Sequence, residues 1–310
     1  MSKKLDSFNG AVLFVDLLGF GALTKQLLPL KNKDYQPWLS NAKYEKNPQF
    51  LAAMILVKFR EILKVVSNEV SDVTVSQLSD CFFVWSSDIE SVVKFSLKFM
   101  HRAINNGILC RGGMAYGQII ITEKNHDFGK LILGSAVTQA VELEKPAKGA
   151  RILTHTDLVH QLFEQNSEFA MKVQDLFKPF TNPLDFTIYD EFKWYLIDSL
   201  DNLPEYGLGQ LSENEKFKAT KGRLKLANRV LYHPKFGWNA SSIPGYIQLQ
   251  ATANFLSENY LLDVFHCFEN KPLSSIRSIK SCSNLDRIVN NDPCYKISPD
   301  PRLKRITMIV

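Results

Sequence analysis

The stretch AVLFVDLLGF, residues 11–20, decides the fold. Its first five residues are apolar without alternation, which is typical of a strand buried on both faces. Asp16 ends this strand, and the glycine-containing turn after it leads into a short apolar helix that we expect to reach Leu28. The stretch therefore predicts a central strand with a carboxylate at its end, at one edge of a sheet.

The segments that follow predict a helix, two strands, a second helix and a further pair of strands. With the strand at residues 11–16, this is the βαββαβ order of a ferredoxin-like unit, so the predicted fold class is α+β. The hairpin and the helices are indicated by β-rich runs, by helical spacing and by capping signals. The predicted segments are a helix from Pro48, strands at 73–78 and 81–85, a helix from Ser87 to Gly107, and strands at 108–116 and 118–122 kinked at Gly117.

Beyond this unit the pattern predicts more helices and a final hairpin. Residues 1–200 are interpreted as one domain with an inserted flap at 29–48, and residues 201–310 as a helical and irregular C-terminal extension. The expected segments are helices at 134–145, 157–165 and 212–232, a strand at 151–154, a hairpin of strands at 186–189 and 193–197, and a terminal strand at 305–310.

Length, charge and cysteine usage exclude several classes of protein. The 310 residues carry a net charge of +5, which is too dilute to indicate a nucleic-acid partner. There is no apolar run long enough to cross a membrane and no secretory signal pattern, so we expect a cytoplasmic chain without a membrane partner. The five cysteines are odd in number and lack C-x-x-C spacing, which argues against disulfides and zinc.

Two aspartates are candidates for metal chemistry. Asp16 ends the first strand, and Asp80 lies at the tip of the hairpin that neighbours this strand in a ferredoxin-like sheet. Adjacent carboxylates repel each other unless a cation neutralises them, and oxygen ligands favour Mg²⁺ or Mn²⁺. An aspartate that ends a strand or caps a turn is also common as a structural residue. Their convergence nevertheless predicts a divalent metal site.

The neighbourhood of the two aspartates adds groups that suit phosphate. The turn at residues 17–20 exposes backbone N–H groups at a helix start, where anions bind. Arg111 lies on a glycine-bearing strand, and its planar fork suits polyphosphate. A second glycine-led helix begins at Gly134.

Four motifs occur in the order seen in class III nucleotidyl cyclases, and the chain resembles that family over about residues 10–200. The motifs are FVDLLGF at 14–20, LSD at 78–80, RGGMAYG at 111–117 and the pattern G…V…A…LE at 134–144. The resemblance implies a class III cyclase domain. Such an enzyme converts a nucleoside triphosphate to a 3′,5′-cyclic monophosphate and pyrophosphate, as a head-to-tail homodimer with composite active sites.

The resemblance also implies roles for individual residues. Asp16 and Asp80, assisted by the Leu17 carbonyl, would hold two Mn²⁺ or Mg²⁺ ions per active site, and Arg111 would contact the triphosphate. The triphosphate would be wrapped by the turn that includes Leu18, Gly19 and Phe20. The catalytic set implied in this way is Asp16, Asp80 and Arg111.

Departures from the family pattern point to the substrate. Ser76 stands where adenylate cyclases place a base-reading Lys, and Leu131 falls near their second base-reading position. Thr138 and Glu142 replace the Asn and Arg that stabilise the transition state. A pocket that loses its polar partners rejects the old base. The chain looks most like the bacterial pyrimidine cyclases of the antiphage Pycsar systems, which share the R-G-x-x-x-x-G strand at 111–117, the S-D hairpin at 79–80 and the A-x-x-L-E helix at 140–144.

This closer resemblance implies conversion of UTP, or of CTP, to the cyclic monophosphate, a second messenger read by a separate effector protein. Tyr44 or Phe50 would narrow the base pocket. Three alternatives remain: a catalytically degenerate module that binds a nucleotide, a purine cyclase, and a relative of polymerase palms or diguanylate cyclases. UTP is favoured over CTP only because it is the commoner substrate among relatives.

Overall fold

The computed structural model describes residues 5–39, 46–122, 131–182 and 186–257. Two of the predictions above lie outside these residues. They are the base-pocket role of Tyr44 and the terminal strand at 305–310.

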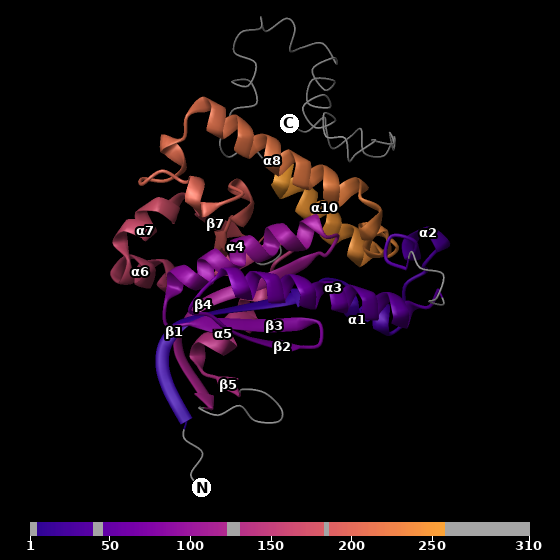
Figure 1. Ribbon diagram of the computed structural model, residues 1–310, viewed down its shortest axis with the longest axis horizontal. Coiled ribbons are helices and arrows are strands. Elements are labelled where there is room, and N and C mark those ends of the chain that lie inside the picture. The colour runs from indigo at the N-terminus through magenta and orange to yellow at the C-terminus, as the bar shows by residue number, and fades with distance from the viewer. Residues whose placement is uncertain (1–4, 40–45, 123–130, 183–185, 258–310) are drawn as a thin grey trace, which may run out of the picture.

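Within the described residues, eight strands form one sheet in the order β2-β3-β1-β4-β6-β8-β7, with β5 paired to β4 (Figure 1). β1 pairs antiparallel with both β3 and β4, and β4 pairs in parallel with β6. The strands are β1 Leu5–Leu17, β2 Thr74–Leu78, β3 Cys81–Ser86, β4 Cys110–Thr122, β5 Ile132–Leu133, β6 Ile152–Thr154, β7 Phe177–Thr181 and β8 Ile188–Phe192.

The first four strands have the ferredoxin-like order β2-β3-β1-β4, which confirms the predicted α+β class and the βαββαβ core. The helices are α1 Phe20–Thr24, α2 Asn32–Tyr35, α3 Pro48–Glu69, α4 Ile89–Asn105, α5 Ser135–Glu144, α6 Thr156–Gln165, α7 Ser167–Val173, α8 Glu213–Tyr232, α9 Gly237–Ala240 and α10 Ile243–Ser257. Helix α3 begins as expected, because the Asn47 side chain caps it and Pro48 occupies its first turn.

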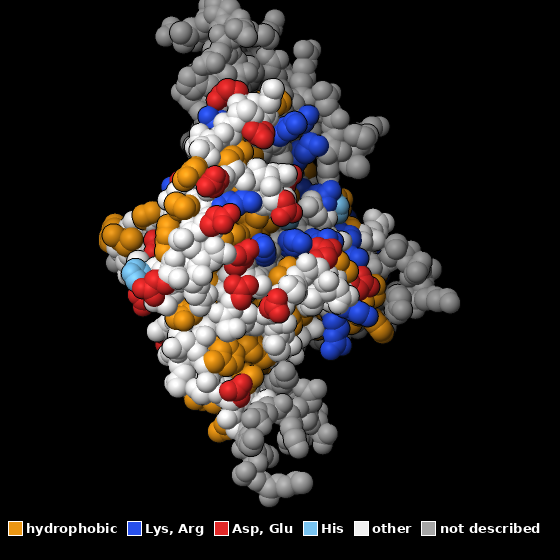
Figure 2. Space-filling model, turned by 60° about the vertical axis from the view of Figure 1, so that its left-hand side comes forward, with side chains coloured by type: hydrophobic (Ala, Val, Ile, Leu, Met, Phe, Trp, Pro, Cys, Tyr) orange, Lys and Arg blue, Asp and Glu red, His pale blue; other side chains and the backbone are white. Residues whose placement is uncertain are grey.

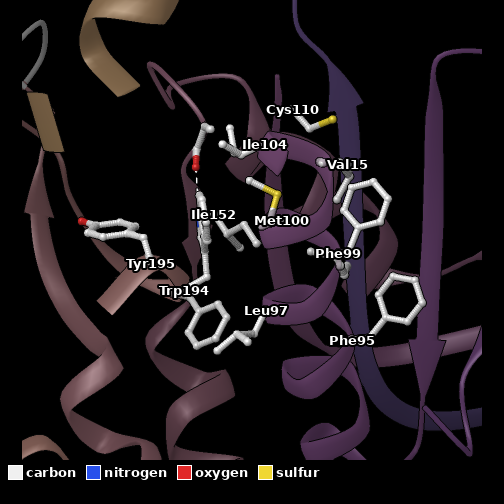
Figure 3. Close-up of a cluster of buried hydrophobic side chains, with 14 of the residues drawn as sticks. Val15, Phe95, Leu97, Phe99, Met100, Ile104, Cys110, Ile152, Trp194 and Tyr195 are labelled. Carbon is white, nitrogen blue, oxygen red and sulfur yellow. Dashed lines mark hydrogen bonds between the residues drawn. The ribbon is translucent and has the colours of Figure 1, made fainter. Parts of the chain in front are cut away.

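The sheet buries its two faces differently. Helices α3 and α4 cover one face, where alternate residues of β1 and β3 meet the rings of Phe59, Phe95 and Phe99. Figure 3 shows Val15, Phe99, Met100 and Trp194 side by side in this cluster. The opposite face carries a smaller cluster packed against α5. Because side chains alternate along a strand, the site residues of β1 lie on this second face.

Four segment predictions are wrong. Strand β4 is continuous across Gly117. The last hairpin is formed by β7 and β8, and residues 194–196 form a 3₁₀ helix instead of a strand. The helix expected from Ser87 is α4, which begins at Ile89 and is capped by Asp88, whose carboxylate accepts from the N–H groups of Glu90 and Ser91. Helix α1 also ends at Thr24, short of the expected Leu28.

The described part of the C-terminal extension, residues 201–257, packs on α4 and α2 (Figure 1). Its buried residues Leu226, Phe236, Trp238, Leu249 and Phe255 belong to the same apolar cluster as α3 and α4. Helix α8 begins at a capping box formed by Ser212 and Glu215, which agrees with the expected helix.

The described surface carries mixed charge. On the face seen in Figure 2, basic and acidic side chains are interspersed. Ion pairs join Lys94 to Glu90 and Arg102 to Glu69 on and beside α4. None of the helices within the described residues is long and apolar enough to cross a bilayer.

Candidate functional site

The candidate site lies where β1 ends. The register places Asp16 opposite Cys81 of β3 and opposite Arg111 of β4. The β2–β3 turn is held against this end, because the Leu17 N–H donates to the Asp80 carbonyl at 3.0 Å. Asp16 and Asp80, predicted to converge, therefore lie at the end of β1 and in the turn beside it, and the charge of Asp80 acts on the carboxyl group of Asp16.

Arg111 is held by the chain itself. Its guanidinium forms an ion pair with Glu144 at the end of α5, and its Nη1 donates to the Ala147 carbonyl at 3.0 Å. Glu144 comes this close because Gly113 has no side chain: a Cβ there would lie 2.1 Å from the Ala140 carbonyl oxygen. The glycines of the RGGMAYG motif thus bring α5 onto β4, and with it a third carboxylate to the site.

The carboxylates around Asp16 disfavour its charged form. Burial, followed by the negative charges of Glu144 and Asp80, raises the pKa of Asp16 from 3.8 to about 7. Arg111 and the backbone hydrogen bond at Leu17 act in the opposite direction and only partly offset this. Without a cation, the end of β1 therefore has an excess of negative charge in a half-buried place.

The negative charges at this site also affect the two cysteines within the described residues, Cys81 and Cys110. Burial and the charges of Asp80, Asp16 and Glu144 raise the pKa of the Cys81 thiol to about 11. Burial also raises the pKa of Cys110, which lies fully inside the core. Neither cysteine is a nucleophile near neutral pH, because the thiolate is the reactive form.

The donor set fits Mg²⁺ or Mn²⁺. Within the described residues, no three His, Cys, Asp or Glu side chains are arranged to hold a metal ion. Mg²⁺, however, is commonly held by one or two carboxylates, with waters and substrate phosphates completing its shell. Asp16, Asp80 and the nearby Leu17 carbonyl match that pattern, and a cation would relieve the repulsion that raises the pKa of Asp16.

The turn at residues 17–20 is only partly free to bind phosphate. The Leu17 N–H donates to Asp80, and the Leu18 N–H donates to the Leu109 carbonyl at 2.8 Å. Gly19 has a φ of 85°, in the left-handed region that favours glycine, and caps the five-residue helix α1. The first N–H groups of a helix have no acceptor within it, which leaves those of Gly19 and Phe20 for a ligand.

The remaining predicted residues are spread over the fold. Ser76 pairs with Phe83, which lies opposite Phe14, so Ser76 lies on the same face of the sheet as Asp16. Thr138 is exposed on α5, about 9 Å along the helix from Glu144. Leu131 pairs with Thr122, at the end of β1 opposite to Asp16.

Phe50 is 42% exposed in the first turn of α3. Within a single chain, neither Thr138 nor Leu131 lies beside Asp16.

Two residues at the site were missed as functional. Glu144 is visible in sequence as the last residue of the α5 motif, and its pairing with Arg111 follows once α5 is placed against β4. Asn239 donates from Nδ2 to the Leu18 carbonyl at 3.0 Å. No sequence pattern indicates that contact, because 221 residues separate the two partners.

The chain is similar, at low sequence identity, to solved structures of nucleotidyl cyclases. No protein-family model and no curated protein matches the sequence. Among solved structures, the guanylyl cyclase Cya2 matches at 11% identity and a TM-score of 0.42, over 60% of this chain and 92% of that one.

A bacterial light-regulated adenylyl cyclase matches at 12% identity and a TM-score of 0.42, over 70% of this chain and 57% of that one. The guanylate cyclase domain of RhGC from Catenaria anguillulae in complex with GTP matches at 14% identity and a TM-score of 0.38, over 60% of this chain and 96% of that one. Likeness at this level carries no argument about activity.

Proposed function

We propose that this chain is a nucleotidyl cyclase whose active centre lies at the end of β1. The observation that carries the proposal is the convergence of Asp16, Asp80 and Arg111 at the end of β1 in a ferredoxin-like sheet. Two carboxylates at adjoining strand ends suit a divalent cation, and a guanidinium beside them suits a polyphosphate. This combination matches a reaction in which pyrophosphate leaves.

In this proposal, Asp16, Asp80 and the Leu17 carbonyl hold the metal ions. When bound, those ions supply charge neutralisation at the attacking and leaving oxygens. The N–H groups of Gly19 and Phe20 bind phosphate oxygens, and Arg111 neutralises charge that develops on the leaving pyrophosphate. Arg111 keeps donors for this role, because its contacts to Glu144 and Ala147 do not use all five N–H groups of a guanidinium.

The reaction is an intramolecular displacement. The ribose 3′-oxygen forms a bond to the α-phosphorus, the bond from that phosphorus to the bridging oxygen breaks, and the hydroxyl proton passes to solvent. The products are a 3′,5′-cyclic monophosphate and pyrophosphate. The task of the protein is to fold the triphosphate so that the 3′-oxygen faces the phosphorus, which is positioning rather than covalent catalysis.

For the substrate we propose UTP, or CTP, and a role in antiphage signalling through a separate cyclic-nucleotide-sensing effector. Ser76 supports this substrate proposal. It lies on the same face of the sheet as Asp16, and its side chain is shorter than that of the Lys that reads the base in adenylate cyclases. The competing proposal is a purine substrate, with cyclic AMP or cyclic GMP as its product.

We further propose a homodimer with composite sites. Thr138 lies two helical turns from Glu144, so in a single chain it cannot join the groups around Asp16. Mixing an Asp16→Asn chain with a Thr138→Trp chain tests this directly. Composite sites restore activity in the mixture although each variant alone is inactive, and the absence of any recovery contradicts a shared site.

The central experiment incubates the purified protein with ATP, GTP, CTP or UTP and Mn²⁺, and identifies the products by mass. Cyclic UMP or cyclic CMP as the main product is the expected result. Asp16→Ala and Asp80→Ala should each abolish it while the variants stay folded. Undiminished turnover in either variant contradicts the metal assignment, and cyclic AMP or cyclic GMP as the main product contradicts the pyrimidine proposal.

A second candidate function is a nucleotide-binding module without catalysis. The observation that favours it is the ion pair between Arg111 and Glu144, which occupies part of the guanidinium expected to bind triphosphate. Thr138 and Glu142, in place of an Asn and an Arg, point the same way. Binding of a triphosphate in calorimetry, with no product from any of the four, would support the module over the enzyme.

A further inference from the structure

The C-terminal extension reaches the candidate site through Asn239. This residue lies in α9 and is 2% exposed, and its Nδ2 donates to the Leu18 carbonyl at 3.0 Å. Leu18 follows Asp16 by two residues and belongs to the turn proposed to wrap the triphosphate. A segment of the chain beyond the cyclase resemblance thus bonds directly to the backbone beside the site.

The neighbouring residue covers the same turn. A Cβ at Gly19 would lie 3.3 Å from the Asn239 Nδ2 and 3.4 Å from the Trp238 ring. Gly19 has a φ of 85°, so its left-handed conformation and its lack of a side chain both match this cover. The shape of the turn is therefore determined from two sides, by Asp80 through Leu17 and by α9 through Leu18.

Asn239 is costly to keep at this position. Among the described residues, its buried Oδ1 has no hydrogen-bond partner, and neither does the Nε1 of Trp238 beside it. A buried polar atom without a partner destabilises a fold, and most such atoms in proteins are paired. An apolar residue at this position would avoid the unpaired buried oxygen. The contribution of Asn239 therefore lies in the hydrogen bond that it donates to Leu18.

A second contact of the extension supports the other side of the site. Gln248 Oε1 accepts from the Gly149 N–H at 2.6 Å, and Thr252 Oγ1 accepts from the Ala150 N–H at 2.9 Å, both from α10. The loop they hold begins beside Ala147, the residue whose carbonyl binds Arg111. The extension is therefore bonded to the two backbone segments that flank the pair of Asp16 and Arg111.

We propose that Asn239 is a positioning residue of the active centre, and that the described part of the C-terminal extension works as a clamp on the turn after Asp16 and on the loop that holds Arg111. The effect of this role on catalysis rests on the proposed cyclase function. The clamp itself is a statement about the backbone of this chain and is measurable without turnover.

The test compares Asn239→Leu with Trp38→Phe in the full chain. Leu keeps the branched shape of the Asn side chain, at a larger volume, and removes the donor to Leu18. Trp38 Nε1 donates to the Lys235 carbonyl at 3.0 Å, so Trp38→Phe deletes another hydrogen bond of the extension, one that does not involve the turn. The measurements are hydrogen exchange of the peptide spanning residues 17–24, the affinity for Mn²⁺ alone by electron paramagnetic resonance, and KM and kcat for the triphosphate.

The clamp predicts that Asn239→Leu speeds exchange in that peptide by about fivefold or more, the effect of one lost hydrogen bond, and weakens Mn²⁺ binding by a similar factor. Trp38→Phe should leave both within about twofold, even where it lowers the melting temperature more. Unchanged exchange in Asn239→Leu overturns the proposal, and so does an equal change in both variants.

These outcomes separate the two proposals. A wild-type chain that makes no cyclic nucleotide refutes the cyclase function, while the exchange and Mn²⁺ comparisons still decide the clamp. With an active wild type, a positioning role predicts that Asn239→Leu lowers kcat at saturating Mn²⁺, because the misplaced turn persists after the ions bind. A purely structural role moves only the melting temperature, and that result overturns the proposal.

Discussion

Replacing Asp16 by Asn should make the metal-free protein more stable and inactive at the same time. The pKa of Asp16 is raised from 3.8 to about 7, so its ionised form is disfavoured in the folded chain relative to the unfolded one. A protein that holds a carboxyl group with a raised folded-state pKa loses stability as pH rises. The loss begins near the pKa of the group in the unfolded chain and ends near its pKa in the folded chain. The loss from Asp16 therefore develops between about pH 4 and pH 7.

The size of the effect follows from the shift. Three pH units correspond to about 4 kcal/mol at about 1.4 kcal/mol each, and solvent screening of this half-buried group reduces the expected value to about 2 kcal/mol. Asn is neutral at every pH and nearly isosteric, so Asp16→Asn avoids the loss. At pH 8 we expect a gain of about 2 kcal/mol over the wild type, or a melting temperature higher by about 4 °C.

The assay is urea denaturation in EDTA at pH values from 4.5 to 8, repeated with Mn²⁺. Without metal, the gap between variant and wild type should open with pH and level off above pH 7. With Mn²⁺, the wild type should gain stability and the variant should not, because binding to the folded state alone stabilises it. A variant that is no more stable than the wild type at pH 8, or an equal gain from Mn²⁺ in both, refutes the electrostatic reasoning.

Three further predictions concern the surroundings of Asp16. Gly113→Ala should cost about 3 kcal/mol in urea denaturation, because its Cβ would collide with the Ala140 carbonyl, whereas Gly222→Ala on α8, with nothing within 4 Å, should stabilise by about 0.5 kcal/mol or more. Equal effects would contradict the close packing of α5. Glu144→Gln removes the charge that raises the pKa of Asp16 most, so in this background the pH-dependent gain from Asp16→Asn should shrink by on the order of 1 kcal/mol. A gain of unchanged size would show that Glu144 does not act on Asp16. Cys81, with a pKa of about 11 against 9.0, should be alkylated at pH 8 about a hundredfold more slowly than an unperturbed cysteine, as measured by mass spectrometry of its peptide. Alkylation at the ordinary rate would contradict the negative field.

The core of the fold was predictable because its signals are local. The apolar run before Asp16, the two-residue break between β2 and β3, and the Asn47–Pro48 helix start each determine an element without help from distant residues. Their order then leaves few topologies, of which the ferredoxin-like one was confirmed.

The last hairpin was not predictable because tertiary contacts override its local pattern. Within the β-rich run at residues 193–197, residues 194–196 form a 3₁₀ helix instead, and Trp194 is buried with Nε1 donating to the Ala150 carbonyl. Beside it, Glu191 is fully buried against Arg151 and Lys193. Strand β7 was missed because Pro179 interrupts its signal, although a proline is tolerated in a strand at the edge of a sheet.

The strand residues of the candidate site were predictable from the sequence, and the residues that hold them in place were not. Strand order alone places Asp16 beside Asp80 and Arg111. The pairing of Arg111 with Glu144 requires the packing of α5 on Gly113, and the contact of Asn239 requires the position of the extension. Sequence motifs report the groups that face a ligand, whereas the groups behind them are decided by packing between segments far apart in the chain.

The packing of the extension on α4 has a practical consequence for protein production. A fragment trimmed at residue 200, where the cyclase resemblance ends, would expose the apolar surface that Phe236, Trp238 and Phe255 cover. Large exposed apolar surfaces drive aggregation, so we expect such a fragment to be insoluble rather than a minimal enzyme. A domain boundary drawn from sequence similarity alone would remove residues that pack into the same apolar cluster as α3 and α4, so the chain should be expressed with residues 201–257 in place.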